Sequence, residues 1–332
     1  MDKKLNKTWE VSAYDKQNQE WTTALNHSWE HHPDIDDIRE LLVREAPPTR
    51  ITPSRRRKPT RTDSLTLVAG DAQMPFHDET AMELFQTAVR ELQPDNIVLV
   101  GDMVDLPNLS RFKQRPEWLG TTQQSIDQYH SFLAQTRSNS PNSRLAVVHG
   151  NHEQRFDNYI QTNAMELLGL RRANAGKELA ILTLQHLVRY DELEVESIDG
   201  YPAGTLYLED NLKFMHGTNT QKGGSNAAKY LREHRESVIY GHSHRSELAF
   251  RTWGSRLGGI TIAAASPGCL ARVDGSVPGY NHTIDSQGEV VNYNEDWQQG
   301  LLIVEHNERH HDITPVRFHE NTMRVYGKVY EV

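Results

Sequence analysis

Short apolar runs, each closed by a glycine and a polar residue, recur from Ser64 to the end of the chain. Five of them read LTLVAG, NIVLVG, RLAVVHG, LKFMHG and SVIYGHSH. Because they are rich in β-branched residues and contain few polar positions, they predict strands buried on both faces of a sheet. A further buried strand is expected in ITIAAASPG, and residues 300–332 have the pattern of antiparallel strands.

Helical patterns separate several of these runs. Asp78 is a suitable N-cap for a helix that continues to Leu92 with apolar residues on one face. Further helices are expected over 122–136 and 226–234, and a mostly helical insertion is expected over about 156–195. Because strands and helices alternate, the pattern predicts an α/β fold in layers.

The first 63 residues have a different pattern. Period-2 alternation over residues 9–25 predicts a hairpin, and a helix is expected over 35–43, so residues 1–45 are interpreted as a small N-terminal module. Residues 46–62 carry four prolines, six basic residues and no acid. This composition predicts an extended linker over 46–63, with a nucleic-acid-binding arm as the alternative. Residues 64–332 form the remaining domain.

Composition narrows the classes of protein to consider. The 332 residues carry a formal charge of -9, which argues against a general polyanion binder unless a local basic patch exists. A single cysteine, Cys269, excludes an intrachain disulfide framework and a cysteine-cluster zinc site. The sequence contains neither a long apolar span nor a secretory leader pattern, so we expect no membrane partner and a cytoplasmic protein.

Side chains that bind metals follow the apolar runs. Carboxyl ends of strands in α/β sheets share one edge, so these residues are expected to meet there. Carboxylate and amide oxygens together with imidazole nitrogens bind Mn²⁺, Fe or Zn²⁺. Each residue alone is explained as a turn former, a cap or a core histidine, but together they indicate a metal site. The set is Asp71, Asp102, Asn151, His216, His242 and His244.

The order of these motifs resembles a known family. The sequence contains DAQ at 71–73, GDMVD at 101–105, GNHE at 150–153, HG at 216–217 and GHSH at 241–244. This set is similar to the calcineurin-like metallophosphoesterase superfamily, and the wider sequence resembles its phage and prophage members. The resemblance implies a layered β-sandwich flanked by helices, here with a small N-terminal appendage, and the host cytoplasm as location if the chain is phage-encoded.

The resemblance also implies a ligand set for two divalent metal ions bridged by Asp102. In this assignment His152 is the catalytic residue, acting as general acid or stabilising negative charge, while a metal-bridging hydroxide attacks phosphorus. Mn²⁺ is the expected metal, with Mg²⁺, Fe or Zn²⁺ as alternatives. The first metal takes Asp71, Gln73 and His244, and the second takes Asn151, His216 and His242.

Gln73 departs from the family pattern, in which the first motif is Asp-x-His. A carboxamide oxygen is a neutral hard donor, so we expect weaker occupancy of the first site and a preference for Mn²⁺ or Mg²⁺ over Zn²⁺. His77 is an alternative ligand. The favoured interpretation is that His77 contacts the ligands without binding metal or lies at the start of a helix.

Three residues near the motifs have open assignments. Asp105 either hydrogen-bonds a metal-bound histidine or caps the following loop. Arg111 and Arg245 either hold a substrate phosphate or form surface ion pairs.

The motifs favour a phosphodiesterase or nuclease acting on nucleic acid or a nucleotide. Asp105 is followed by Leu106 and Pro107 and not by the arginine that marks the Ser/Thr protein phosphatases, so the motif does not resemble that branch. The first alternative is a phosphomonoesterase acting on small molecules or phosphoproteins. The second is a metal-stabilised binding protein without catalysis.

Overall fold

The computed structural model describes residues 11–15, 20–24 and 63–332, the last without 112–117, 119, 175, 177, 210, 222–224, 255–258 and 278–295. The chain divides into two compact units, Met1–Ser54 and Arg55–Val332. In the first unit, strand β1 (Val11–Asp15) pairs antiparallel with β2 (Glu20–Ala24). The helix predicted over 35–43 and the linker predicted over 46–62 lie outside the described residues.

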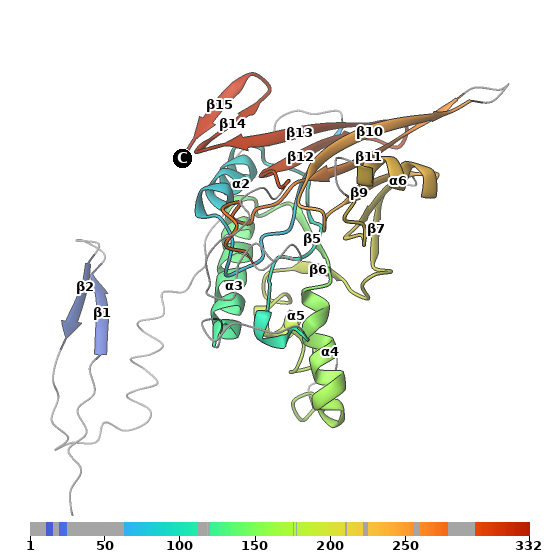
Figure 1. Ribbon diagram of the computed structural model, residues 1–332. Helices are drawn as coiled ribbons and strands as arrows, with labels where there is room; N and C mark the ends of the chain where they lie inside the picture. Colours follow the sequence, from blue (N-terminus) through green and yellow to red (C-terminus); the bar gives the residue numbers. More distant parts are fainter. Residues whose placement is uncertain are drawn as a thin grey trace, which may run out of the picture. The chain divides into compact units, whose positions relative to one another are not determined.

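The second unit contains two sheets (Figure 1). The larger has four parallel strands, β3 to β6, extended by antiparallel strands β12 to β15. Its order is β15 (Lys328–Glu331), β14 (Thr322–Val325), β13 (His311–His319), β12 (Gly300–His306), β3 (Ser64–Ala69), β4 (Asn96–Leu99), β5 (Arg144–Val148) and β6 (Val195–Ile198).

The smaller sheet has three parallel strands, β8, β9 and β11, with an antiparallel strand at each edge. Its order is β10 (Ser246–Trp253), β11 (Ile260–Pro267), β9 (Ser237–Tyr240), β8 (Leu212–Met215) and β7 (Thr205–Leu208).

Helices cover the outer faces of both sheets. Asp78 caps α2 as predicted, because its Oδ1 accepts a hydrogen bond of 2.9 Å from the amide of Ala81. The helical segments are α2 (Glu79–Leu92), η1 (Pro107–Leu109), α3 (Thr121–Asn139), α4 (Glu153–Asn163), η3 (Met165–Leu167), α5 (Leu184–Val188) and α6 (Ser225–Glu233).

Three buried apolar clusters hold these layers together. Between the sheets, Val98 of β4 belongs to the same cluster as Phe214 of β8. Phe85 and Leu133 place α2 and α3 against the other face of the larger sheet. Tyr230 places α6 against the smaller sheet. The predicted layered α/β sandwich flanked by helices is therefore confirmed.

The helical prediction for 156–195 is wrong in its middle part. Helical structure there is confined to α4, η3 and α5, and the described residues of 168–183 form turns and irregular backbone. Gly169 and Gly176 adopt φ of 76° and 62°, a left-handed conformation that interrupts a helix. Leu168 and Leu170 in this part are exposed. None of the described helices is long and apolar enough to cross a membrane.

Candidate metal centre

The candidate ligands lie in loops at the carboxyl ends of five parallel strands. Asp71 follows β3, Asp102 follows β4 and Asn151 follows β5, all in the larger sheet. His216 follows β8, and His242 follows β9, in the smaller sheet. Both sheets direct these ends toward the same place, so residues separated by more than 170 positions come within hydrogen-bonding distance, as His242 and Asp71 show.

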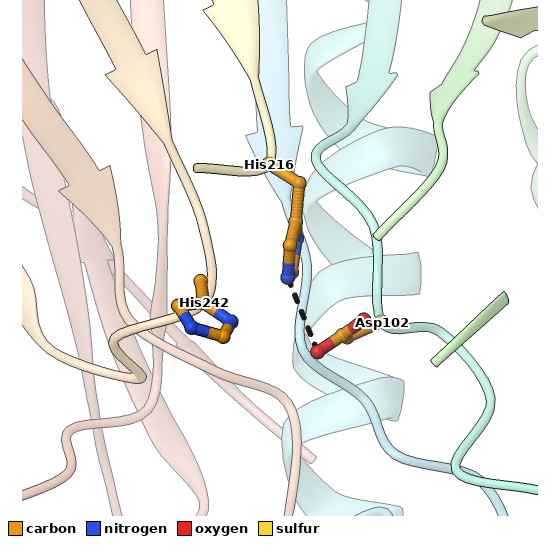
Figure 2. Close-up of side chains that lie close together, drawn as sticks. All are labelled: Asp102, His216 and His242. Carbon is orange, nitrogen blue, oxygen red and sulfur yellow. Dashed lines mark ion pairs between the residues drawn. The ribbon is translucent and has the colours of Figure 1, made fainter. Parts of the chain in front are cut away.

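One group of ligands lies around His216. Its Nε2 atom is 3.1 Å from Asp102 Oδ2 and 3.2 Å from Asn151 Oδ1. The rings of His216 and His242 are 5.1 Å apart. Figure 2 shows His216 directed at Asp102, with His242 beside them, and the potential ligand atoms of these three residues lie within 4.8 Å of one another. This group can hold a cation.

A second group lies around His244 and also contacts Asp102. His244 Nε2 is 3.2 Å from Asp71 Oδ1. Gln73 Nε2 is 3.4 Å from both Asp102 Oδ2 and His244 Nε2. The structure thus places Gln73 with the other candidate ligands. His77, the alternative, instead has its Nε2 atom 3.2 Å from Glu79 Oε1.

The backbone at these positions is unusual. Five candidate ligands adopt positive φ, which is uncommon for residues with a side chain and concentrates at functional sites. Gly101 shows why the loops can approach so closely, since a Cβ added there would lie 2.8 Å from His216 Nδ1. The φ values are 51° for Asp71, 56° for Gln73, 51° for Asp102, 67° for His242 and 56° for His244.

Glu153 fixes two of these loops. Its side chain is buried at the start of α4 and accepts hydrogen bonds from the backbone amides of Asp102 (2.9 Å), Met103 (2.7 Å) and Gly150 (2.8 Å). A carboxylate that accepts three amide hydrogen bonds holds those amides in place. Sequence reasoning missed this role, although the acid stands in the GNHE motif, where its position at the helix start was a usable signal.

His152 belongs to a network with Asp105 and Arg155. The Nδ1 atom of His152 is 3.3 Å from Asp105 Oδ1, and its Nε2 atom is 3.8 Å from Asp102 Oδ2. Arg155 Nη2 lies 2.9 Å from His152 Nε2, and Arg155 Nη1 pairs with Asp105. Asp105 therefore contacts His152, which neither sequence-based alternative anticipated, and Arg155 was not predicted at all.

The two other candidate arginines differ in their surroundings. Arg245 is buried, with its Nε atom 3.0 Å from Asp296 Oδ2, and it donates a hydrogen bond of 2.7 Å to the carbonyl of Gln221. Arg111 lies in the lining of a cleft that also contains Asn151. Of the pair, Arg111 shares a cleft with a candidate ligand, whereas Arg245 directly follows the candidate ligand His244 in the chain.

The site is electrostatically polarised. Burial alone lowers the pKa of His216, but the charge of Asp102 and its hydrogen bond outweigh burial and raise that pKa to about 9. Burial and the neighbouring His216 lower the pKa of His242 to about 3. Burial raises the pKa of Asp102, yet His152 and His216 outweigh it and hold that pKa well below the usual range. Asp102 is thus stabilised as an anion, and His242 as a neutral donor.

These residues fit divalent metal ions. Gln73 Oε1 and His244 Nδ1 are buried and lack a hydrogen-bond partner among the described residues. A half-turn of the Gln73 amide would exchange its nitrogen for this oxygen beside Asp102 and His244. Two buried carboxylates, two amides and three imidazoles form a mixed oxygen and nitrogen donor set of the kind that holds first-row divalent cations.

Residues 65–246 match the family model of the calcineurin-like phosphoesterases. The chain therefore belongs to this family and is a metal-dependent phosphoester hydrolase, which confirms the predicted membership and enzyme class.

Relatives encoded by phages support the predicted phage-type subgroup. The "Gene 54 protein" of Mycobacterium phage D29 is 26% identical over 196 residues, covering 57% of this chain and 72% of the relative. The "Gene 54 protein" of Mycobacterium phage L5 is 23% identical over 191 residues, with the same two coverages of 57% and 72%.

The solved structures to which this chain is similar include a vacuolar sorting protein, a predicted phosphoesterase and a nuclease. Vacuolar Protein Sorting 29 from Cryptosporidium parvum has a TM-score of 0.35 and 9% identity, covering 81% of this chain and 96% of that one. A protein described as a predicted phosphoesterase from Streptococcus pneumoniae has a TM-score of 0.30 and 13% identity, covering 82% and 98%. The nuclease MPE from Pseudomonas putida has a TM-score of 0.27 and 10% identity, covering 75% and 87%.

Proposed function

We propose that this phosphoesterase hydrolyses phosphodiesters, with nucleic acid or a nucleotide as substrate, at a centre of two divalent cations. The observation that carries the proposal is the position of Asp102, whose Oδ2 atom lies 3.4 Å from Gln73 Nε2 and 3.1 Å from His216 Nε2. A single carboxylate between two donor groups suits a bridging ligand.

The proposed ligands divide at Asp102. The residues of the first group contact one another through His244, and those of the second group contact one another through His216. Mn²⁺ is the proposed native metal, because it accepts both oxygen-rich and nitrogen-containing ligand sets. The first cation takes Asp71, Gln73, Asp102 and His244, and the second takes Asp102, Asn151, His216 and His242.

His152 is the proposed general acid. Two cations held here would supply Lewis acidity, which would lower the pKa of water and neutralise charge on the phosphoryl oxygens. His152 lies beside Asp102, at the edge of the donor set, and it can give a proton from Nε2 to the leaving oxygen once substrate displaces Arg155 Nη2, which donates to that nitrogen. Asp105 contacts the other ring nitrogen and so orients the imidazole.

The space beside the centre favours a diester. A diester needs room for an ester group on each side of the phosphorus atom, whereas a monoester needs room on one side only. A cleft of about 670 Å³ begins at Asn151 and continues along α4, away from the other ligands. The segment after Asp105 forms the short helix η1 and leaves this cleft lined by Leu109 and Arg111.

The activity test compares bis(p-nitrophenyl) phosphate with p-nitrophenyl phosphate, both in the presence of Mn²⁺. We expect kcat/KM for the diester to exceed that for the monoester by at least about tenfold. The Asp102→Asn protein serves as the control for contaminating phosphatases. Hydrolysis of the monoester alone would contradict the diesterase proposal and leave a phosphomonoesterase.

The N-terminal residues are proposed to assist binding in the cytoplasm of a phage-infected host. The proposed domains are a module over 1–45, a basic linker over 46–63 and the catalytic domain over 64–332. The six basic residues of the linker offer a local attraction for polyanions that the total charge of -9 does not. Replacing these six by glutamine in the full chain should weaken oligonucleotide binding; unchanged affinity at low salt would reject this role.

A further inference from the structure

The cleft beside α4 differs in charge from the rest of the chain. Although the protein has a formal charge of -9, the described residues lining this cleft include two arginines and no carboxylate. A second cleft of similar size, about 690 Å³, is lined by Glu178, Asp191 and Asp199 and by no arginine or lysine among the described residues. The α4 cleft is therefore the one suited to an anionic chain.

The lining residues of α4 follow the helix away from the candidate metal centre. Arg155, Asn158, Tyr159 and Thr162 are three or four positions apart, so they lie along one face of the helix. From Arg155 to Thr162 this row extends for about 10 Å at the usual helical rise. Asn151 lies at the beginning of this row, so the row starts next to the candidate metal centre.

Tyr159 gives this cleft an aromatic surface. Its side chain is 45% exposed, although large aromatic residues usually bury more of their surface. An exposed ring beside a cationic groove is the arrangement on which unpaired bases stack, with little preference for sequence. The neighbouring amide of Asn158 can both donate and accept hydrogen bonds with base edges.

Arg111 lines the same cleft from outside α4. Arg155 is already engaged with Asp105 and His152, so it belongs to the metal end of the cleft. Arg111 lines the cleft from the segment after η1, where a guanidinium can contact a backbone phosphate. Because the Asp105 carboxylate offsets the charge of Arg155, Arg111 is the arginine proposed to contact the phosphate.

We propose that the α4 cleft binds a single-stranded polynucleotide, with Tyr159 stacking on a base and Arg111 contacting a phosphate. A single strand fits because its bases are free to stack on a side chain, whereas those of a duplex are stacked on each other. This inference rests on the proposed diesterase function and specifies its substrate class.

The first test measures binding of a fluorescein-labelled ten-residue oligothymidylate by anisotropy, using the full chain with Asp102→Asn so that the probe is not cleaved. Adding Tyr159→Ala should raise the dissociation constant roughly tenfold, a change equivalent to about 1.4 kcal/mol and within the contribution of one stacked base. Tyr159→Phe should restore binding because it keeps the ring. Tyr207→Ala is the matched control, since Tyr207 is 49% exposed on β7 and does not line the cleft.

The second test measures the salt dependence of the same binding. Arg111→Ala should reduce the slope of log Kd against log salt concentration by about 0.7, the value for one phosphate contact on a single strand. Arg309→Ala is the control. Arg309 is exposed in the segment between β12 and β13 and does not line the cleft. The basic linker contributes equally to all variants and so cancels.

The outcomes separate the two proposals. If Tyr159→Ala and Tyr207→Ala bind the oligonucleotide equally, or if a phosphoserine peptide displaces it while unlabelled oligothymidylate does not, the cleft assignment is wrong. Hydrolysis of bis(p-nitrophenyl) phosphate by the wild-type protein is measured in parallel. Its absence would overturn the diesterase proposal, whereas the Tyr159 and Arg111 comparisons decide the cleft whatever that result.

Discussion

The two halves of the candidate metal centre share Asp102 but differ in donor chemistry. The first half adds a carboxylate, an amide and one imidazole, and is thus rich in oxygen. The second half adds an amide and two imidazoles, and has no carboxylate of its own. The members are Asp71, Gln73 and His244 in the first half, and Asn151, His216 and His242 in the second.

This difference in donor chemistry indicates that the two halves of one centre can prefer different metals. Oxygen-rich sites suit Mg²⁺ and Mn²⁺, whereas imidazole nitrogens strengthen binding of Zn²⁺ and Fe. The second half is also more firmly positioned, because His216 Nδ1 lies 2.6 Å from the carbonyl of Val100. We therefore expect the second half to retain its metal more tightly than the first.

The largest effect is expected where the halves meet. Asp102→Asn removes the shared negative charge, so both cations should bind weakly and kcat for the diester should fall by at least about 10³-fold. Metal content after dialysis and steady-state kinetics measure the two consequences. Two tightly bound metal ions in this variant would show that the halves do not depend on Asp102.

His242→Ala tests the second half alone. Because it removes one of two imidazoles there, bound Mn²⁺ should fall from about two ions to one per chain, and activity should fall by about 10²-fold. Isothermal titration with Mn²⁺ gives the number of ions. An unchanged stoichiometry would place His242 outside the ligand set.

Glu153→Gln tests how the second half is positioned. Glu153 accepts amide hydrogen bonds from Asp102, Met103 and Gly150, and the amide replacement presents N–H groups to some of these donors. We expect a loss of about 2 kcal/mol in unfolding free energy, measured by urea denaturation of the metal-free protein. Affinity for the Mn²⁺ of the second half should fall more than affinity for the Mn²⁺ of the first. Equal losses would contradict the claim that Glu153 positions the second half.

Gln73→His sharpens the comparison in the first half. An imidazole in place of the amide should raise Zn²⁺ affinity of that half by about tenfold, while Mn²⁺ affinity changes less. His77→Ala is the matched control, because His77 pairs with Glu79. If His77→Ala lowers metal affinity and Gln73→His has no effect, the ligand is His77.

Much of the fold follows from local sequence patterns. Runs such as NIVLVG can be buried only between layers, and the polar residues that close them must lie at the carboxyl edge of a sheet. This placed Asp71, Asp102 and His216 together before any contact was known. The stretch over 168–183 could not be predicted in the same way, because the sequence does not show that Gly169 and Gly176 adopt the left-handed conformation that interrupts a helix.

Details of the site depend on geometry that sequence patterns do not encode. The contact of Arg155 with His152 requires His152 at the N-cap of α4, Arg155 on its first turn and Asp105 on a neighbouring loop. The hydrogen bonds of Glu153 likewise depend on the approach of two loops from different strands. Motif spacing identifies such residues only as neighbours in sequence, so their roles emerge from the structure.

The most direct test of the central claim is an anomalous difference map from crystals of the full chain soaked in Mn²⁺. Our account predicts two peaks about 4 Å apart, one on each side of the Asp102 carboxylate, with His244 at the first and His216 at the second. A single peak, or peaks remote from Asp102, would contradict it.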